Sequence, residues 1–324
     1  MNIGTICYAT RSGLGILAKR FYDHGIINKI LAIQHPHYAN HFDWYKSEDL
    51  YLNSTAAQFS ADIDTLLIFE NAWQYWSLIK NIKGQGKRFA LMPMYEYTPD
   101  PLPVEPDVIL CPSALDKKHY PTGIEVTIPV EQTWHLREHA LRFVHNAGHG
   151  GKDYRNGTPE LLEAMQYVKS PIQLTVRMQP NERRMVDLFH QYYAKDPRVE
   201  IVMADVPDEK LYAEGDVFIF PEKFNGLSLP MQEAWASGMM VMGTDRFPMN
   251  TWLPPNPLIP SVGTTTLTIA KKVESSVINP YILAKWIDAW FMQDIMFYSW
   301  QGKQWAEKNS WAVWKPKYLE LLGG

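Results

Sequence analysis

One segment, residues 215–248, constrains the fold more than any other part of the chain. It reads GDVFIFPEKFNGLSLPMQEAWASGMMVMGTDRFP. Residues 217–220 predict a short buried strand, Leu229 and Pro230 open a helix, and Gly238 ends it. A strand, a loop and a helix N-terminus in this order aim backbone N–H groups and a positive dipole end at one point. The segment therefore predicts a phosphate site of the kind that binds a nucleotide or a nucleotide sugar.

The same residues resemble the donor half of retaining nucleotide-sugar glycosyltransferases of the GT-B kind, which are group-1 glycosyltransferase-like. The positions that match the family pattern are Asp216, Phe220, Pro221, Gly226, Leu229, Pro230, Glu233, Ala234, Ala236, Gly238, Val241 and Thr244. This resemblance implies an α/β fold with two doubly wound Rossmann-like lobes and a cleft between them. It also implies that Glu233 binds the donor ribose and that the backbone of Gly226, Leu227 and Ser228 serves the donor sugar or phosphate.

One position departs from the family pattern. The family usually has two glutamates with seven residues between them, and the second of them matches Glu233, whereas Asn225 stands at the first position. The resemblance implies that Asn225 faces the hydroxyls of the donor sugar. An amide donates and accepts hydrogen bonds but brings no negative charge next to the reacting carbon.

A second glycine-rich segment, NAGHGGKDYRNG over residues 146–157, joins a predicted strand to a helix that reads LLEA. The family carries an arginine and a lysine in this loop. Here the basic pair is displaced, since Asn156 stands at the usual lysine position, Arg155 precedes it and Lys152 lies three residues earlier. We expect Arg155 and Lys152 to contact the diphosphate, arginine as a fork and lysine as a point charge. Arg177, at the end of a later strand, is a further phosphate candidate. His149 is a candidate donor to the phosphate or to the acceptor.

Short apolar runs alternate with helices along the whole chain, which predicts parallel, doubly wound sheets. By resemblance, residues 1–135 form an acceptor-side lobe and residues 140–299 form the donor lobe, and the last helix, about 300–324, packs back on the first lobe. In the N-terminal lobe, the resemblance implies that the turn at Gly13 lines the cleft, and we expect Gly13 to contact the donor. Glu96 is the best carboxylate for an acceptor hydroxyl.

The composition limits the function classes. The net charge is −4 and the pI is about 6.2, so no global basic field attracts nucleic acid. Cys7 and Cys111 lie in apolar strand-like runs and are expected to be buried thiols, which is typical of a cytoplasmic protein. No apolar run is long enough to span a membrane. No metal-ligand spacing stands out, so we expect no metal and no cofactor besides the nucleotide-sugar co-substrate.

These observations predict an enzyme, a hexosyltransferase-type retaining glycosyltransferase that moves a sugar from a nucleotide-diphosphate sugar to a hydroxyl acceptor. The acceptor is a glycan, a small molecule or a base in DNA, as in viral enzymes that glycosylate modified bases. Two other classes share the fold and stay open: a nucleotide-sugar epimerase, and a non-catalytic nucleotide-sugar binder.

Overall fold

The computed structural model describes residues 1–323 except 37, 149–154, 179–195, 205 and 208–209. The chain divides into two compact units. Unit 1 comprises Met1–Ile128, Ile269–Lys271 and Trp311–Gly324, and unit 2 comprises Pro129–Thr268 and Lys272–Ser310. Residues 300–310 lie in unit 2, and the last stretch of the chain from Trp311 lies in unit 1. The assignment of residues 1–135 to an acceptor lobe and 140–299 to a donor lobe stays a prediction.

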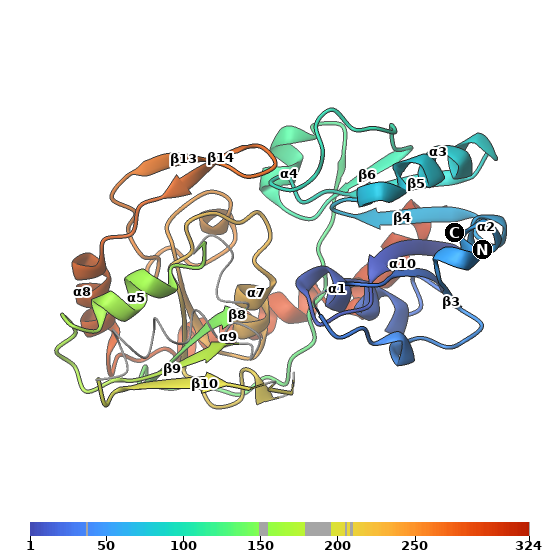
Figure 1. Ribbon diagram of the computed structural model, residues 1–324. Coiled ribbons are helices and arrows are strands. Elements are labelled where there is room, and N and C mark those ends of the chain that lie inside the picture. Colours follow the sequence, from blue (N-terminus) through green and yellow to red (C-terminus); the bar gives the residue numbers. More distant parts are fainter. Residues whose placement is uncertain (37, 149–154, 179–195, 205, 208–209, 324) are drawn as a thin grey trace. The chain divides into compact units, whose positions relative to one another are not determined.

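Unit 1 is built on a seven-stranded sheet in which every paired strand is parallel, in the order β3-β2-β1-β4-β5-β6-β7 (Figure 1). This is the order of a doubly wound fold, and it reverses between β1 and β4. The elements are β1 (Ile3–Tyr8), α1 (Gly13–Asp23), β2 (Lys29–Ile33), β3 (Leu50–Tyr51), α2 (Ala56–Asp62), β4 (Thr65–Phe69), α3 (Trp76–Gly84), β5 (Arg88–Met92), β6 (Val108–Cys111), α4 (Ala114–His119), β7 (Ile124–Glu125) and α10 (Trp311–Leu321).

The C-terminal helix α10 completes the core of unit 1. Trp311 and Tyr318 are buried, and both rings meet the edge of the Phe21 ring, with centroids 5.3 and 4.9 Å away. The Tyr318 hydroxyl donates to the carbonyl oxygen of Thr127 at 2.8 Å. Aromatic packing of this kind, rather than any local signal in α10, explains why the end of the chain belongs with its beginning.

Unit 2 has a five-stranded parallel sheet in the order β10-β9-β8-β11-β12 and a separate antiparallel pair, β13-β14. The sheet order is again that of a doubly wound fold, with its reversal between β8 and β11. The elements are β8 (Arg142–Gly148), α5 (Thr158–Ala164), β9 (Gln173–Met178), β10 (Val199–Met203), β11 (Val217–Phe220), α7 (Leu229–Ala236), β12 (Met240–Gly243), β13 (Thr264–Thr268), β14 (Lys272–Ser276), α8 (Pro280–Trp290) and α9 (Met296–Lys308).

Helix α7 begins and ends where the sequence predicts. Leu229 and Pro230 form its first turn, and Gly238, with φ of 94°, follows its C-terminal end. All residues from Met231 to Ala236 are buried, because the helix packs between the sheet strands β11 and β12 and the helix α9 (Figure 1). A helix that is buried on all sides holds its polar side chains in place, and this applies to Glu233.

Two expectations from the composition can be compared with the structure directly. Cys7 and Cys111 are both buried and free, which confirms the prediction of buried thiols. Within the described part of the chain, none of the helices combines the length and the apolar character that a membrane span requires.

Candidate functional site

The sheet of unit 2 reverses its strand order between β8 and β11. In open parallel sheets, ligands bind outside the carboxyl ends of the strands at such a reversal. β11 leads into the loop 221–228 and then α7, and β8 leads into residues 149–157 and then α5. The two segments that the sequence assigned to one site therefore follow the two strands that flank the reversal.

The two loops contact one another through their backbones. The Lys223 N–H donates to the carbonyl oxygen of Arg155 at 2.6 Å. Gly157 has φ of 71° and lies so close to Pro221 that a Cβ atom would be 2.1 Å from the Pro221 carbonyl oxygen. The side chains of Lys223 and Glu160 form an ion pair beside this contact. The cationic loop and the helix entrance are therefore neighbours within unit 2.

The structure describes only some of the predicted phosphate contacts. The Arg155 side chain is partly exposed at the loop junction. His149 and Lys152 lie outside the described residues, so their roles stay predictions.

Asn225 has a local structural role, and its expected contact with the donor sugar stays a prediction. Its Oδ1 accepts hydrogen bonds from the backbone N–H groups of Leu227 and Ser228, both at 3.1 Å. Ser228 has φ of 48°, a left-handed conformation that this local bonding stabilises. The amide oxygen thus braces the loop. The N–H groups of Leu227 and Ser228, which the resemblance assigned to the donor together with that of Gly226, are already used inside the protein.

A buried ion pair contacts the same loop. Glu222 is fully buried, and its Oε1 lies 3.9 Å from Nη1 of Arg246. The same Nη1 donates to the Asn225 carbonyl oxygen at 3.0 Å. Arg246, three residues after β12, therefore contacts both Glu222 and Asn225 of this loop.

Glu233 is held by a phenol. Its side chain is buried, and Oε2 accepts a hydrogen bond of 2.8 Å from the Tyr212 hydroxyl. The Asn146 amide donates to the same hydroxyl at 3.3 Å. A carboxylate accepts several hydrogen bonds through its two oxygens, which is the chemistry that a clamp on two hydroxyls requires.

Arg177 lies next to Asn146, since the two residues pair in the register of β8 and β9. The guanidinium is buried, and burial lowers its pKa from the ordinary value. Its Nη1 has no hydrogen-bond partner among the described residues, and neither has Oδ1 of Asn146. A buried donor and a buried acceptor without partners are more typical of a ligand site than of a structural core.

A buried histidine that the sequence did not single out connects β11 to the start of α5. His145 of β8 is within hydrogen-bonding distance of the Ile219 carbonyl oxygen through Nδ1, at 2.8 Å, and of Thr158 Oγ1 through Nε2, at 2.7 Å. Thr158 contacts Oδ1 of Asn156 at 2.9 Å, and the Asn156 amide donates to the Ala147 carbonyl oxygen at 2.8 Å. Asn156, which stands where the family has lysine, is therefore a structural residue.

The chain of contacts ends in a carbonyl oxygen on both sides, so all four hydrogen bonds form together only when His145 carries two protons. Burial opposes this and lowers the pKa of His145 to about 4. Desolvating an ion costs several kcal/mol, whereas one unmade hydrogen bond costs about 1–3 kcal/mol. The imidazole is therefore neutral at pH 7. It donates to Ile219 and accepts from Thr158.

The remaining candidates lie in unit 1. Gly13 is the first residue of α1, whose N-terminus is capped by the Ser12 hydroxyl accepting from the Gly15 N–H at 3.2 Å. Glu96 is a buried carboxylate, with only 4% of its surface exposed. Its neighbour Asp116 has a pKa raised to about 7, chiefly by burial and also by the charge of Glu96.

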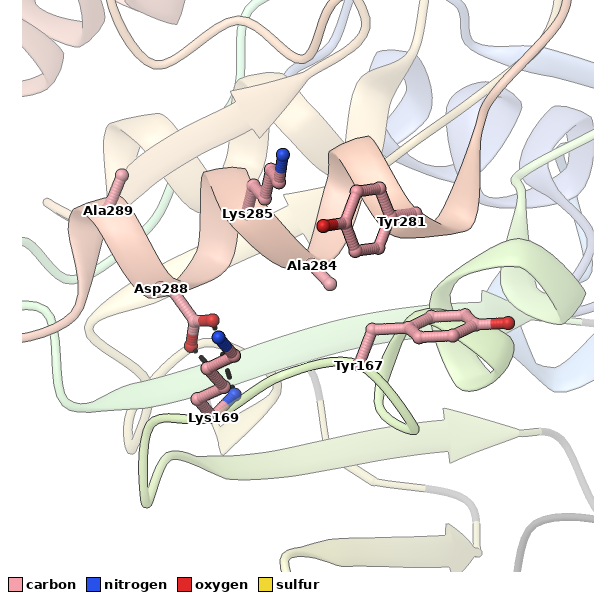
Figure 2. Close-up of a pocket in the computed structure, with 7 residues that line it drawn as sticks. All are labelled: Tyr167, Lys169, Tyr281, Ala284, Lys285, Asp288 and Ala289. Atoms are coloured by element: carbon pink, nitrogen blue, oxygen red, sulfur yellow. Dashed lines mark hydrogen bonds between the residues drawn. The ribbon is translucent and has the colours of Figure 1, made fainter.

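A cavity of about 350 Å³ lies elsewhere in unit 2, between α8 and residues 167–169 (Figure 2). The exposed rings of Tyr167 and Tyr281 meet edge to face there, with centroids 5.8 Å apart. Asp288 accepts hydrogen bonds from the backbone of Lys169, at 3.1 and 3.2 Å. None of the residues that line the cavity belongs to the predicted donor site, so its volume is no argument for that site.

Comparison with solved structures identifies the architecture. HepE from Anabaena, solved with UDP and glucose, superposes with a TM-score of 0.70 at 9% identity, over 99% of both chains. The chain has the GT-B fold. Sucrose-phosphate synthase from Thermosynechococcus elongatus shares the GT-B fold with a TM-score of 0.63 at 13% identity, covering 99% of this chain and 97% of that one. The predicted fold class is confirmed.

The catalytic domain of starch synthase IV from Arabidopsis thaliana, bound to ADP and acarbose, is a third GT-B structure similar to this chain. Its TM-score is 0.61 at 11% identity, over 99% of this chain and 98% of that one. A scan against protein-family models and a search of curated protein sequences each find no match. The similarity to known proteins is therefore one of fold rather than of sequence.

Sequence reasoning missed three residues of the site: Asn146, His145 and Tyr212. The two on β8 had a weak signal, since polar side chains interrupt an otherwise apolar strand. Tyr212 had none, because its contact with Glu233 depends on how two distant segments pack. No group of three or more potential metal ligands lies together in the described part of the chain.

Proposed function

We propose that this protein is a glycosyltransferase that moves a sugar from a nucleotide-diphosphate sugar to a hydroxyl acceptor with retention of configuration. The observation that carries the proposal is the buried Glu233 at the strand-order reversal of unit 2, next to two loops that are bonded together through Arg155 and Lys223. The ligands of the similar GT-B structures, UDP, glucose and ADP, support this assignment.

In the proposed reaction, the bond between the anomeric carbon and the leaving phosphate oxygen breaks, and a bond to the acceptor oxygen forms on the same face. The acceptor proton passes to the departing phosphate, so no side-chain nucleophile is needed. Glu233 accepts hydrogen bonds from the ribose hydroxyls. Arg155 and the entrance of α7 offset the negative charge that grows on the diphosphate. We propose that this chemistry needs no metal ion, and full activity in the presence of EDTA is the expected result.

The first experiment is incubation with UDP-glucose, ADP-glucose and other nucleotide sugars in the presence of candidate hydroxyl acceptors. A transferase releases free nucleoside diphosphate and a glycosylated acceptor. An epimerase yields an isomerised nucleotide sugar, and a pure binder yields neither product. Transfer to oligonucleotides that carry hydroxylated bases would identify a DNA acceptor.

The variant Glu233→Gln tests the placement of the donor site. Replacing a carboxylate that binds hydroxyls costs about 1.5–3 kcal/mol, so affinity for the nucleoside diphosphate should fall by roughly tenfold to a hundredfold. Glu163→Gln is the matched control, because Glu163 is an exposed residue of α5 in the same unit. Equal affinities of the two variants would contradict the proposed site.

A further inference from the structure

The contact between Tyr212 and Glu233 has a fixed direction. A phenol has one proton to donate, and the Tyr212 hydroxyl gives it to Oε2 of Glu233 at 2.8 Å. The oxygen of that hydroxyl accepts from the Asn146 amide at 3.3 Å. The amide, the phenol and the carboxylate therefore form a line of hydrogen bonds that runs from the end of β8 to α7.

Tyr212 is itself held firmly. Its side chain is only 2% exposed, and its ring meets the Phe218 ring edge to face, with centroids 5.7 Å apart. The Arg137 guanidinium donates to the carbonyl oxygens of Tyr212 and Ala213, at 3.1 and 2.8 Å. Neither the backbone nor the ring can shift without breaking these contacts, so the phenol fixes the position of the carboxylate.

Two atoms beside this line lack partners in the described part of the chain: the acceptor Oδ1 of Asn146 and the donor Nη1 of Arg177. Arg177 is about nine-tenths buried. A phosphate oxygen would satisfy the guanidinium but not the amide oxygen, since it has no proton to donate. A sugar hydroxyl satisfies both, because it accepts one hydrogen bond and donates another.

We infer that Tyr212 is a positioning residue, which, supported by Asn146, holds Glu233 for the ribose hydroxyls of the donor nucleotide. The inference also assigns Asn146 and Arg177 to the same ribose. It rests on the proposed function, because it deepens the account of the same donor site. Its consequence is a preference for ribonucleoside diphosphates over their 2′-deoxy forms.

The test measures binding of UDP, ADP and GDP, and of their 2′-deoxy forms, by isothermal titration calorimetry. The unmodified protein should bind its preferred ribonucleotide about tenfold more tightly than the 2′-deoxy form. Tyr212→Phe should reduce this ratio at least about threefold and change the affinity for the 2′-deoxy form by less than about twofold. A purely structural loss would weaken both nucleotides alike.

Tyr167→Phe is the control, since Tyr167 is an exposed tyrosine of the same unit, and it should leave the ratio unchanged. If Tyr212→Phe does not fold, Asn146→Ala tests the same line of hydrogen bonds and should also lower the ratio. A ratio near one in the unmodified protein, or an unchanged ratio in a folded variant, overturns the inference and leaves the proposed function intact. If the unmodified protein binds none of the nucleotides, the proposed function fails as well.

Discussion

The packing of α9 against α7 leads to a specific prediction about Gly302. A Cβ atom at this position would lie 2.1 Å from the carbonyl oxygen of Trp235 and 2.7 Å from Cδ1 of the same residue. Real Cβ atoms essentially never come closer than 3.0 Å to another heavy atom, so in Gly302→Ala the two helices must separate by about 0.9 Å. Helix α7 carries Glu233, and the strain therefore reaches the candidate site.

Two opposing terms set the size of the effect. Alanine in place of a helical glycine stabilises by about 0.5–1 kcal/mol. Inserting a methyl group into a closely packed interior costs about 1–3 kcal/mol, and a backbone carbonyl is a contact that yields little. The substitution should therefore lower the free energy of unfolding by about 1–2 kcal/mol, which corresponds to a fall of about 2–8 °C in the melting temperature of a unit of this size.

Urea unfolding, followed by circular dichroism, measures this difference. Gly84→Ala is the matched control, because Gly84 is an exposed helical glycine at the end of α3 whose added Cβ would meet nothing within 4 Å. The control should be unchanged or slightly stabilised. If Gly302→Ala is as stable as the unmodified protein and binds nucleotide equally well, the close approach of α7 and α9 is not a constraint and the reasoning fails.

Two further predictions concern the loops of unit 2. Gly157→Ala should cost about 1–2 kcal/mol in left-handed strain plus the clash with Pro221. Gly148→Ala, with φ of 61° and no atom of the described residues within 4 Å of its Cβ, should show the strain alone. Urea unfolding of the two variants compares them directly, and equal losses would contradict the contact with Pro221. The pKa of His145 is about 4 in the folded protein and lies near 6.5 in the unfolded chain. Its contribution to the free energy of unfolding is therefore full above pH 6.5 and decreases as the pH falls toward 4. The decrease is at most about 1.4 kcal/mol per pH unit. Asp116, with its raised pKa, acts in the opposite direction, so the measurement is the difference between the unmodified protein and His145→Gln across pH 4.5–8. A difference that does not vary with pH would show that His145 is not buried as a neutral group.

Asn225 illustrates what a sequence pattern leaves undecided. The family resemblance aligned it with a residue that faces the donor sugar, yet in this chain its amide oxygen binds the N–H groups of Leu227 and Ser228. The alignment gives the position along the chain and not the direction of the side chain. An asparagine two or three residues before free N–H groups favours a local turn, and the amide oxygen forms such a turn here. A contact between this side chain and the donor sugar stays a prediction.

Glu96 shows that the local sequence does not reveal whether a side chain is buried. Its place after a predicted strand made it the best candidate for an acceptor hydroxyl, and this role stays a prediction. Only the packed unit shows that Glu96 is buried beside Asp116. Burial depends on the elements that cover a residue, and these come from remote parts of the chain.

The sequence alone was enough for the features that neighbouring residues decide: the buried strand at 217–220, the proline-opened helix with Gly238 at its end, and the alternation that gives two doubly wound sheets. Three contacts are known only from the tertiary structure. They are the backbone hydrogen bond between Arg155 and Lys223, the hydrogen bond from Tyr212 to Glu233, and the close packing of Gly302 on Trp235. Strand and helix preferences act over a few neighbouring residues, so they can be predicted from the sequence. Contacts between residues tens of positions apart follow from strand order and helix packing, which the whole chain settles together.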